Sequence, residues 1–267
     1  MKNDIQPQTT VQEKPITVFV ISWGRPIYLW ACLDALYKNT RSAMKVVLFD
    51  NAHPDPLVSR VIEGFERRGL FDEVVRFKTN TSDNIVKAYE ERLVDAGPLH
   101  VYLESDCVIL CESGCWLAEM KSVMDSQPKL AMLGSLIDPT DFVSEDKAIA
   151  LTGGDKESSN FLSKLHSPER AFIQDSPMED EALGYIPIGK DSAISNPPGR
   201  LMMLRTSLMQ QVGLKLDVKL ARYFTEQGFS TGISAKVRHR HLSLMNIYDY
   251  WDYSADQRTA FFSGLNS

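Results

Sequence analysis

The segment Leu99-His100-Val101-Tyr102-Leu103-Glu104-Ser105-Asp106 carries the strongest structural signal in the chain. Its apolar first part predicts a buried strand, and two carboxylates, Glu104 and Asp106, stand at the end of that strand. Burying an unpaired carboxylate is costly, so such a pair normally faces a ligand or a metal ion. With Ser105 between them, both would lie on one side of an extended backbone. Two hard oxygen donors beside a phosphate suit Mg²⁺ or Mn²⁺, so we expect a nucleotide-diphosphate substrate.

Strand-like and helix-like segments alternate on both sides of this segment. The expected strands are 16–21, 45–49, 73–77, 99–106 and 130–133, and the expected helices are 26–38, 57–68, 83–94 and 116–126. This alternation predicts an α/β fold with a parallel sheet and helices on both faces. Right-handed crossovers place the C-terminal ends of the strands on one edge, where open α/β sheets bind ligands. That edge should gather the carboxylate pair and the segments 22–25, 50–51 and 80–84.

The second half of the chain is less regular. Residues 138–198 are rich in Ser, Gly, Pro and acidic residues and are interpreted as a long loop. A strand at 199–205, helices at 206–212 and 217–227 and a strand at 233–237 follow, and then Arg238-His239-Arg240-His241. We expect a flexible tail at 1–14, one domain at 15–242 and an aromatic extension at 243–267. The domain divides at 135/136 into two halves.

Composition narrows the class of function. The chain has 267 residues, 43% of them apolar and 24% charged, and its net charge of −6 argues against a nucleic-acid partner. No apolar run reaches the ~20 residues of a membrane span, and no secretion signal begins the chain, which indicates a cytoplasmic protein. Peripheral membrane contact and homo-oligomers stay open. Cys107, Cys111 and Cys115 lack the paired spacing of zinc sites, and we expect reduced thiols.

Four segments carry a family resemblance. Residues 16–36 contain VFVISWGRPIYLWACLDAL, residues 46–55 read VVLFDNAHPD, and residues 101–109 read VYLESDCVI. The fourth, residues 199–228, comprises a strand, a helix and a second helix that begins at Asp217. In their order and spacing these segments resemble the nucleotide-sugar-dependent glycosyltransferases of GT-A fold, family 2 type. The third stands at the place of that family's DxD metal motif.

The resemblance implies a fold, a reaction and a site. The fold would be GT-A, a Rossmann-like, mostly parallel sheet flanked by helices, with a mixed acceptor-side half at 136–242. The reaction would transfer a sugar from a UDP- or GDP-linked donor to a saccharide or glycoconjugate acceptor, with inversion favoured over retention. Polysaccharide biosynthesis is the context that such relatives suggest. The implied donor-binding residues are Ser22, Arg25, Asp50, Asn84, Glu104, Ser105 and Asp106; Asp106, Glu104 and His241 would hold Mn²⁺ or Mg²⁺, and Asp217 would be the catalytic base.

Several of these residues also have ordinary structural explanations. Turn formation accounts for Asp50 equally well, helix capping accounts for Asn84, and Arg25 precedes a helix start. His239 and His241 share one face of an extended segment, so either imidazoles or the alternating arginines would face a diphosphate. Asp217 suits an N-cap, where the helix dipole would lower its pKa.

Two departures from the family keep a second function open. Glu104 replaces the first Asp of DxD, and Asp217 lacks the second carboxylate that usually precedes the helix. The alternative is therefore a non-catalytic nucleotide-sugar or saccharide binding protein. A nucleotidyltransferase or dehydrogenase is disfavoured, because residues 22–25 lack a glycine-rich phosphate loop.

Overall fold

The computed structural model describes residues 14–53, 55–110, 114–138, 144–152, 183–188 and 199–242. In these ranges the strands are β1 (Ile16–Ser22), β2 (Met44–Asp50), β3 (Glu73–Arg76), β4 (Leu99–Glu104), β5 (Cys107–Leu110), β6 (Leu130–Ile137), β7 (Tyr185–Ile188), β8 (Leu201–Arg205) and β9 (Ser230–His241). The helices are α1 (Pro26–Asn39), α2 (Pro56–Glu66), α3 (Ser82–Leu93), α4 (Trp116–Ser126), α5 (Glu145–Thr152), α8 (Thr206–Val212) and α9 (Asp217–Glu226). The described strands form one sheet in the order β3-β2-β1-β4-β8-β6-β9-β5, and β7 pairs with β9.

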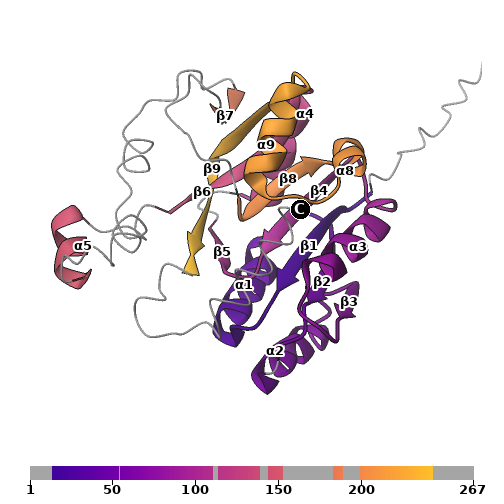
Figure 1. Cartoon of the computed structure of the whole chain (residues 1–267), viewed down its shortest axis with the longest axis vertical. Coiled ribbons are helices and arrows are strands. Elements are labelled where there is room, and N and C mark those ends of the chain that lie inside the picture. Colours follow the sequence, from indigo (N-terminus) through magenta and orange to yellow (C-terminus); the bar gives the residue numbers. More distant parts are fainter. Residues whose placement is uncertain are drawn as a thin grey trace, which may run out of the picture.

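Side-chain alternation along the central strands fills two cores. On β1, Val18 and Val20 belong to one core and Phe19 to the other, because successive side chains of a strand point to opposite faces. Helices α1, α2 and α4 supply apolar residues to the first core, whereas α3, α8 and α9 supply them to the second. Figure 1 shows the sheet running through the molecule between these helices. The expected α/β fold with helices on both faces is confirmed.

The parallel half brings three strand ends together. β1 pairs in parallel with β2 and β4, and this register sets Ser22 beside Asp50 and Ile21 beside Glu104. Beyond the strands, the Asn51 N–H donates to the Ser22 carbonyl at 2.9 Å. The polar residues that follow these strands therefore lie along one edge of the sheet, as the alternation predicts.

The other half of the sheet is mixed. β8 runs antiparallel to β4, and the Glu104 N–H donates to the Arg200 carbonyl at 2.9 Å. β9 runs parallel to β6 and antiparallel to β5, where Cys107 pairs with His241. One consequence is that Arg200, directly before β8, and His241, at the end of β9, both reach the end of β4.

Some expected boundaries were wrong. The strand that begins at Leu99 ends at Glu104 rather than at residue 106, because residues 105–106 form a turn, and Cys107 begins β5, which pairs with β9. Residues 233–241 belong to one long strand, β9. The stretch at 138–198 is not wholly loop, since it contains α5 and β7. The tail at 1–13, Cys111 and the aromatic extension at 243–267 lie outside the described residues.

No helix within the described ranges combines the length and the apolar character that a membrane crossing requires.

Candidate active site at the end of β4

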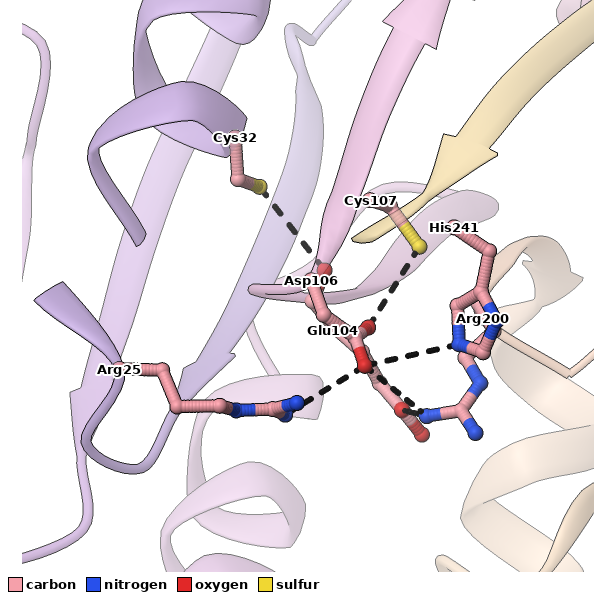
Figure 2. Close-up of polar contacts among 7 residues, drawn as sticks. All are labelled: Arg25, Cys32, Glu104, Asp106, Cys107, Arg200 and His241. Atoms are coloured by element: carbon pink, nitrogen blue, oxygen red, sulfur yellow. Dashed lines mark hydrogen bonds and ion pairs between the residues drawn. The ribbon is translucent and has the colours of Figure 1, made fainter. Parts of the chain in front are cut away.

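Asp106 is the centre of a buried charged cluster. Its side chain is 0% exposed, and its Oδ2 atom lies 3.4 Å from Arg25 Nη2, 3.4 Å from Arg200 Nη1 and 3.5 Å from His241 Nε2. Its other oxygen accepts a weak hydrogen bond from the Cys107 thiol at 3.8 Å. Figure 2 shows these groups converging from the turn after β4, from the start of α1, from the residue before β8 and from the end of β9.

Arg200 joins the two carboxylates of the cluster. Its Nη1 atom donates to Glu104 Oε2 and also reaches Asp106 Oδ2. The premise that Glu104 and Asp106 share one side of an extended backbone was wrong, because the chain turns between them. They nevertheless meet through this one guanidinium (Figure 2), to which both carboxylates are bound.

The surroundings push the two carboxyl pKa values in opposite directions. Burial acts to raise the pKa of Asp106, but Arg200, His241 and Arg25 outweigh it and hold that pKa well below its ordinary value. For Glu104, burial raises the pKa, and repulsion from Asp106 and Asp217 adds to it against the attraction of Arg200. Asp106 is therefore the fixed negative charge of the site.

Arg25 reaches Asp106 because of an unusual backbone turn. Gly24 and Arg25 have positive φ angles of 64° and 51°, and Arg25 is the N-cap of α1. A Cβ at Gly24 would lie 2.4 Å from Cδ2 of the His53 ring, so glycine is required there for space as well as for conformation. The Arg25 guanidinium lies 5.0 Å from the centre of the Tyr28 ring, which also orients it.

A second group of polar atoms lies at the ends of β1 and β2. Ser22, Asp50 and Asn51 are buried, and within the described part of the chain Ser22 Oγ, Asp50 Oδ1 and Asn51 Oδ1 have no hydrogen-bond partner. The same holds for Trp23 Nε1. Burial raises the pKa of Asp50, opposed by the Arg76 charge. Buried polar atoms without partners are rare, and several together indicate a place for a polar ligand.

Asp217 lies beside the charged cluster. It is the first residue of α9, and its Oδ1 accepts from the Val218 N–H at 2.8 Å. A Cβ at Gly199 would lie 2.3 Å from Asp217 Oδ2, so this carboxylate packs directly over the backbone next to Arg200. The expected lowering of its pKa was wrong: burial raises it more than the Val218 hydrogen bond and Arg200 lower it.

Two of the sequence-predicted site residues are engaged elsewhere. The half-buried Asn84 side chain donates to the Thr79 carbonyl at 2.7 Å, and the Asn84 N–H donates to Thr81 Oγ1, the side chain that caps α3. Ser105 is buried, and its N–H donates to the Ile21 carbonyl. Its contact anchors the turn between the two carboxylates.

Several solved structures share the architecture of this chain. No protein-family model matches the sequence, and no curated protein matches it. GalNAc-T7, solved with UDP, GalNAc and Mn²⁺, matches with a TM-score of 0.56 and 11% identity over 85% of this chain and 43% of that chain. TarS 1-349 of S. aureus matches with a TM-score of 0.54 and 15% identity over 95% of this chain and 71% of that chain. The mannosyltransferase PcManGT of Pyrobaculum calidifontis was solved with GDP-Man and Mn²⁺. It matches with a TM-score of 0.53 and 14% identity over 96% of this chain and 69% of that chain.

The chain has the GT-A fold. It spans less than half of the first of these proteins and about seven-tenths of the other two. At these identities the likeness extends to the fold, and the roles of individual residues rest on the geometry described above.

The cluster has suitable donors for a divalent ion in this GT-A fold, but they are not arranged as a ready site. The carboxylates of Glu104 and Asp106 and the imidazole of His241 are the donor types that Mn²⁺ accepts. Among the described residues, however, no three acidic, His or Cys side chains converge closely enough to hold a metal ion. Arg200 lies between the carboxylates instead.

The sequence interpretation missed, or left without a role, three residues: Arg200, Trp23 and Asn51. Arg200 belongs to a predicted strand, and a role follows only once β8 is known to lie antiparallel beside β4. A usable signal exists, since a charged residue directly before an apolar strand needs a partner at the neighbouring strand's end.

Proposed function

We propose that the chain is a glycosyltransferase that moves a sugar from a UDP- or GDP-linked donor to a hydroxyl of a saccharide or glycoconjugate acceptor. The observation that supports it most is the grouping of two features on one sheet edge. One is the buried cluster at Asp106, and the other is the set of unpartnered polar atoms of Ser22, Asp50 and Asn51. A nucleoside diphosphate has matching parts, a hydrogen-bonding base and an anionic diphosphate.

Each end of the donor then has a proposed partner. Asp50, with Ser22, would accept and donate hydrogen bonds at the nucleobase edge, and the guanidiniums of Arg25 and Arg200 lie where they can bind phosphate oxygens. Asp106, Glu104 and His241 would hold Mn²⁺ or Mg²⁺, which supplies Lewis-acid stabilisation of the departing diphosphate. Asn84 keeps only a peripheral place in this proposal.

Asp217 is the proposed base that deprotonates the acceptor hydroxyl. Its raised pKa suits that role better than the lowered value expected of an exposed helix N-terminus, because a more basic carboxylate is a better proton acceptor. Direct attack by the deprotonated hydroxyl on the anomeric carbon, opposite to the leaving diphosphate, would invert the configuration. We therefore propose inversion, with polysaccharide biosynthesis as the setting.

A nucleotide panel tests the donor half of the proposal. Thermal unfolding is followed with UDP, GDP, ADP and their common sugar derivatives, each with and without Mn²⁺; a ligand that binds only the folded state raises the melting temperature. One nucleotide should stand out, and the Asp50→Asn variant should lose most of that shift. No shift with any uridine or guanosine diphosphate would contradict the proposal.

A turnover assay distinguishes a glycosyltransferase from a non-catalytic nucleotide-sugar binding protein. Release of the nucleoside diphosphate from the selected donor, dependent on an acceptor from a saccharide panel, is the expected result, and NMR of the anomeric proton reads the configuration. Binding without release would instead favour the non-catalytic nucleotide-sugar binding protein.

A further inference from the structure

Arg200 holds a position that a divalent ion would also need. We propose that Arg200 and the divalent ion bind the Glu104–Asp106 pair in mutually exclusive states, so that the guanidinium must leave before the ion enters. The free protein would then bind the ion weakly, and the donor diphosphate would strengthen that binding. The first statement concerns the cluster alone, whereas the second rests on the proposed function.

The charge count of the cluster supports exclusion. Two carboxylates, Glu104 and Asp106, are balanced by two guanidiniums, Arg25 and Arg200, so the group carries no net negative charge. A divalent cation gains attraction from anionic donors and loses it to nearby cations at the same short range. With both arginines in place, their repulsion would offset most of the attraction that the ion gains from Glu104 and Asp106.

The geometry of the cluster also supports mutually exclusive binding of Arg200 and the ion. An ion bound to Asp106 Oδ2 would lie about 2 Å from that oxygen. Arg200 Nη1 is 3.4 Å from the same atom and also donates to Glu104 Oε2, so it occupies the space between the two carboxylates. Figure 2 shows the guanidinium on the side of Asp106 that also faces His241. An ion shared by these three residues would therefore overlap with Arg200.

Of the two arginines, Arg200 is the one free to rearrange. Arg25 is held by the left-handed turn at the start of α1 and by the Tyr28 ring. Arg200 follows Gly199 and is 25% exposed at its side chain, and within the described part of the chain its side-chain hydrogen bonds and ion pairs go only to the two carboxylates. Its long side chain can turn toward an added diphosphate without a change in the sheet.

Mn²⁺ alone, without nucleotide, is the probe for the exclusion. Free Mn²⁺ is measured by EPR in titrations of the wild type, Arg200→Gln and the double variant Arg200→Gln/Asp106→Asn. Arg200→Gln should bind Mn²⁺ about tenfold or more tightly than the wild type, a typical size for coupling between two competing sites. The double variant should lose that gain, because it lacks the central ligand.

Thermal unfolding provides a second readout. Arg200→Gln leaves two carboxylates with one counter-charge, so it should melt below the wild type, and MnCl₂ should restore much of the loss. MnCl₂ should shift the wild type little. If Arg200→Gln fails to fold, Arg200→Lys replaces it: a lysine cannot bridge both carboxylates in the same planar geometry, and Mn²⁺ affinity should still rise.

The matched control is Arg60→Gln on the exposed face of α2, which removes the same charge from a side chain outside the cluster. It should bind Mn²⁺ as the wild type does. Equal Mn²⁺ affinity in wild type and Arg200→Gln, or a loss of affinity in Arg200→Gln, would overturn the exclusion. Such a result leaves the nucleotide panel unaffected, so it can be distinguished from failure of the proposed donor site. If the exclusion holds, adding the selected nucleoside diphosphate should tighten Mn²⁺ binding to the wild type more than to Arg200→Gln.

Discussion

If Asp217 is the base as proposed, Gly199→Ala should lower the rate of glycosyl transfer without unfolding the protein. A Cβ at residue 199 would lie 2.3 Å from Asp217 Oδ2, whereas ordinary contacts of this kind are 3.4 Å or longer. The carboxylate oxygen must therefore retreat by about 1 Å, and misplacement of a reacting group by that amount can cost about 100-fold in rate. We expect kcat to fall by that factor.

The same substitution should cost little stability. The atom that must move is the end of a side chain at the start of α9, not backbone, and rotation of the carboxylate relieves the overlap. The change in free energy of unfolding should stay within about 1 kcal/mol. Urea unfolding measures that quantity, and release of nucleoside diphosphate from the selected donor measures kcat.

A double-variant cycle isolates the cause. In Asp217→Ala the clashing oxygen is absent, so adding Gly199→Ala to it should have almost no further effect on kcat. Gly64→Ala is the matched control: its Cβ would meet nothing within 4 Å, and in the interior of α2 the change should stabilise the protein by about 0.5–1 kcal/mol with unaltered kcat. Wild-type kcat in Gly199→Ala, or a full additive loss in the double variant, would refute the placement of Asp217 as the base.

Three further predictions concern single residues. Asp106→Asn should lower the free energy of unfolding by about 3 kcal/mol, because Arg25 and Arg200 would face each other without the negative charge between them. Urea titration measures this free energy. An unchanged unfolding midpoint would show that the Asp106 charge does not offset the two arginines. Asp50→Asn should leave the free energy of unfolding unchanged or raise it, since Asp50 Oδ1 has no partner in the described chain. Its affinity for the nucleotide, measured by calorimetry, should fall about tenfold. Equal affinity would show that Asp50 does not bind the nucleobase. Burial lowers the pKa of His100 from 6.5 to about 3, so the unfolded state binds the proton first, and stability present above pH 6.5 is lost as the pH falls. Between about pH 7.5 and about pH 4.5 the wild type should lose about 3 kcal/mol more than His100→Gln, and equal losses would contradict a neutral buried imidazole.

Local patterns were sufficient for the parallel half of the fold. Alternating strand and helix signals predict β1, β2 and β4. Right-handed crossover connections between parallel strands then bring the C-terminal ends of these strands to one edge of the sheet, as the pairing of Ser22 with Asp50 confirms. The apolar run from Leu99 likewise predicts a buried strand that ends in carboxylates. These features follow from local periodicity and from the handedness of the crossover connections, although β1 and β4 lie far apart in the sequence.

Non-local pairing explains what the sequence did not reveal. Arg200 meets Glu104 across a separation of 96 residues, through an antiparallel insertion of β8 that no short pattern encodes. The pKa of Asp217 depends likewise on its surroundings. The helix N-terminus and Arg200 both favour the anion, but burial outweighs them and raises the pKa of Asp217.

The pKa values of the two carboxylates shift in opposite directions, which gives Glu104 and Asp106 different roles in the site. Asp106 has three nitrogen neighbours and stays charged, so it fixes the position of the cations around it. Among the described residues, Arg200 attracts the Glu104 carboxylate, whereas Asp106 and Asp217 repel it, and its pKa is raised. Arg200 therefore binds one strong and one weak anion. A diphosphate that drew Arg200 away would leave Glu104 without the guanidinium that contacts it, whereas Asp106 would keep Arg25 and His241 as neighbours.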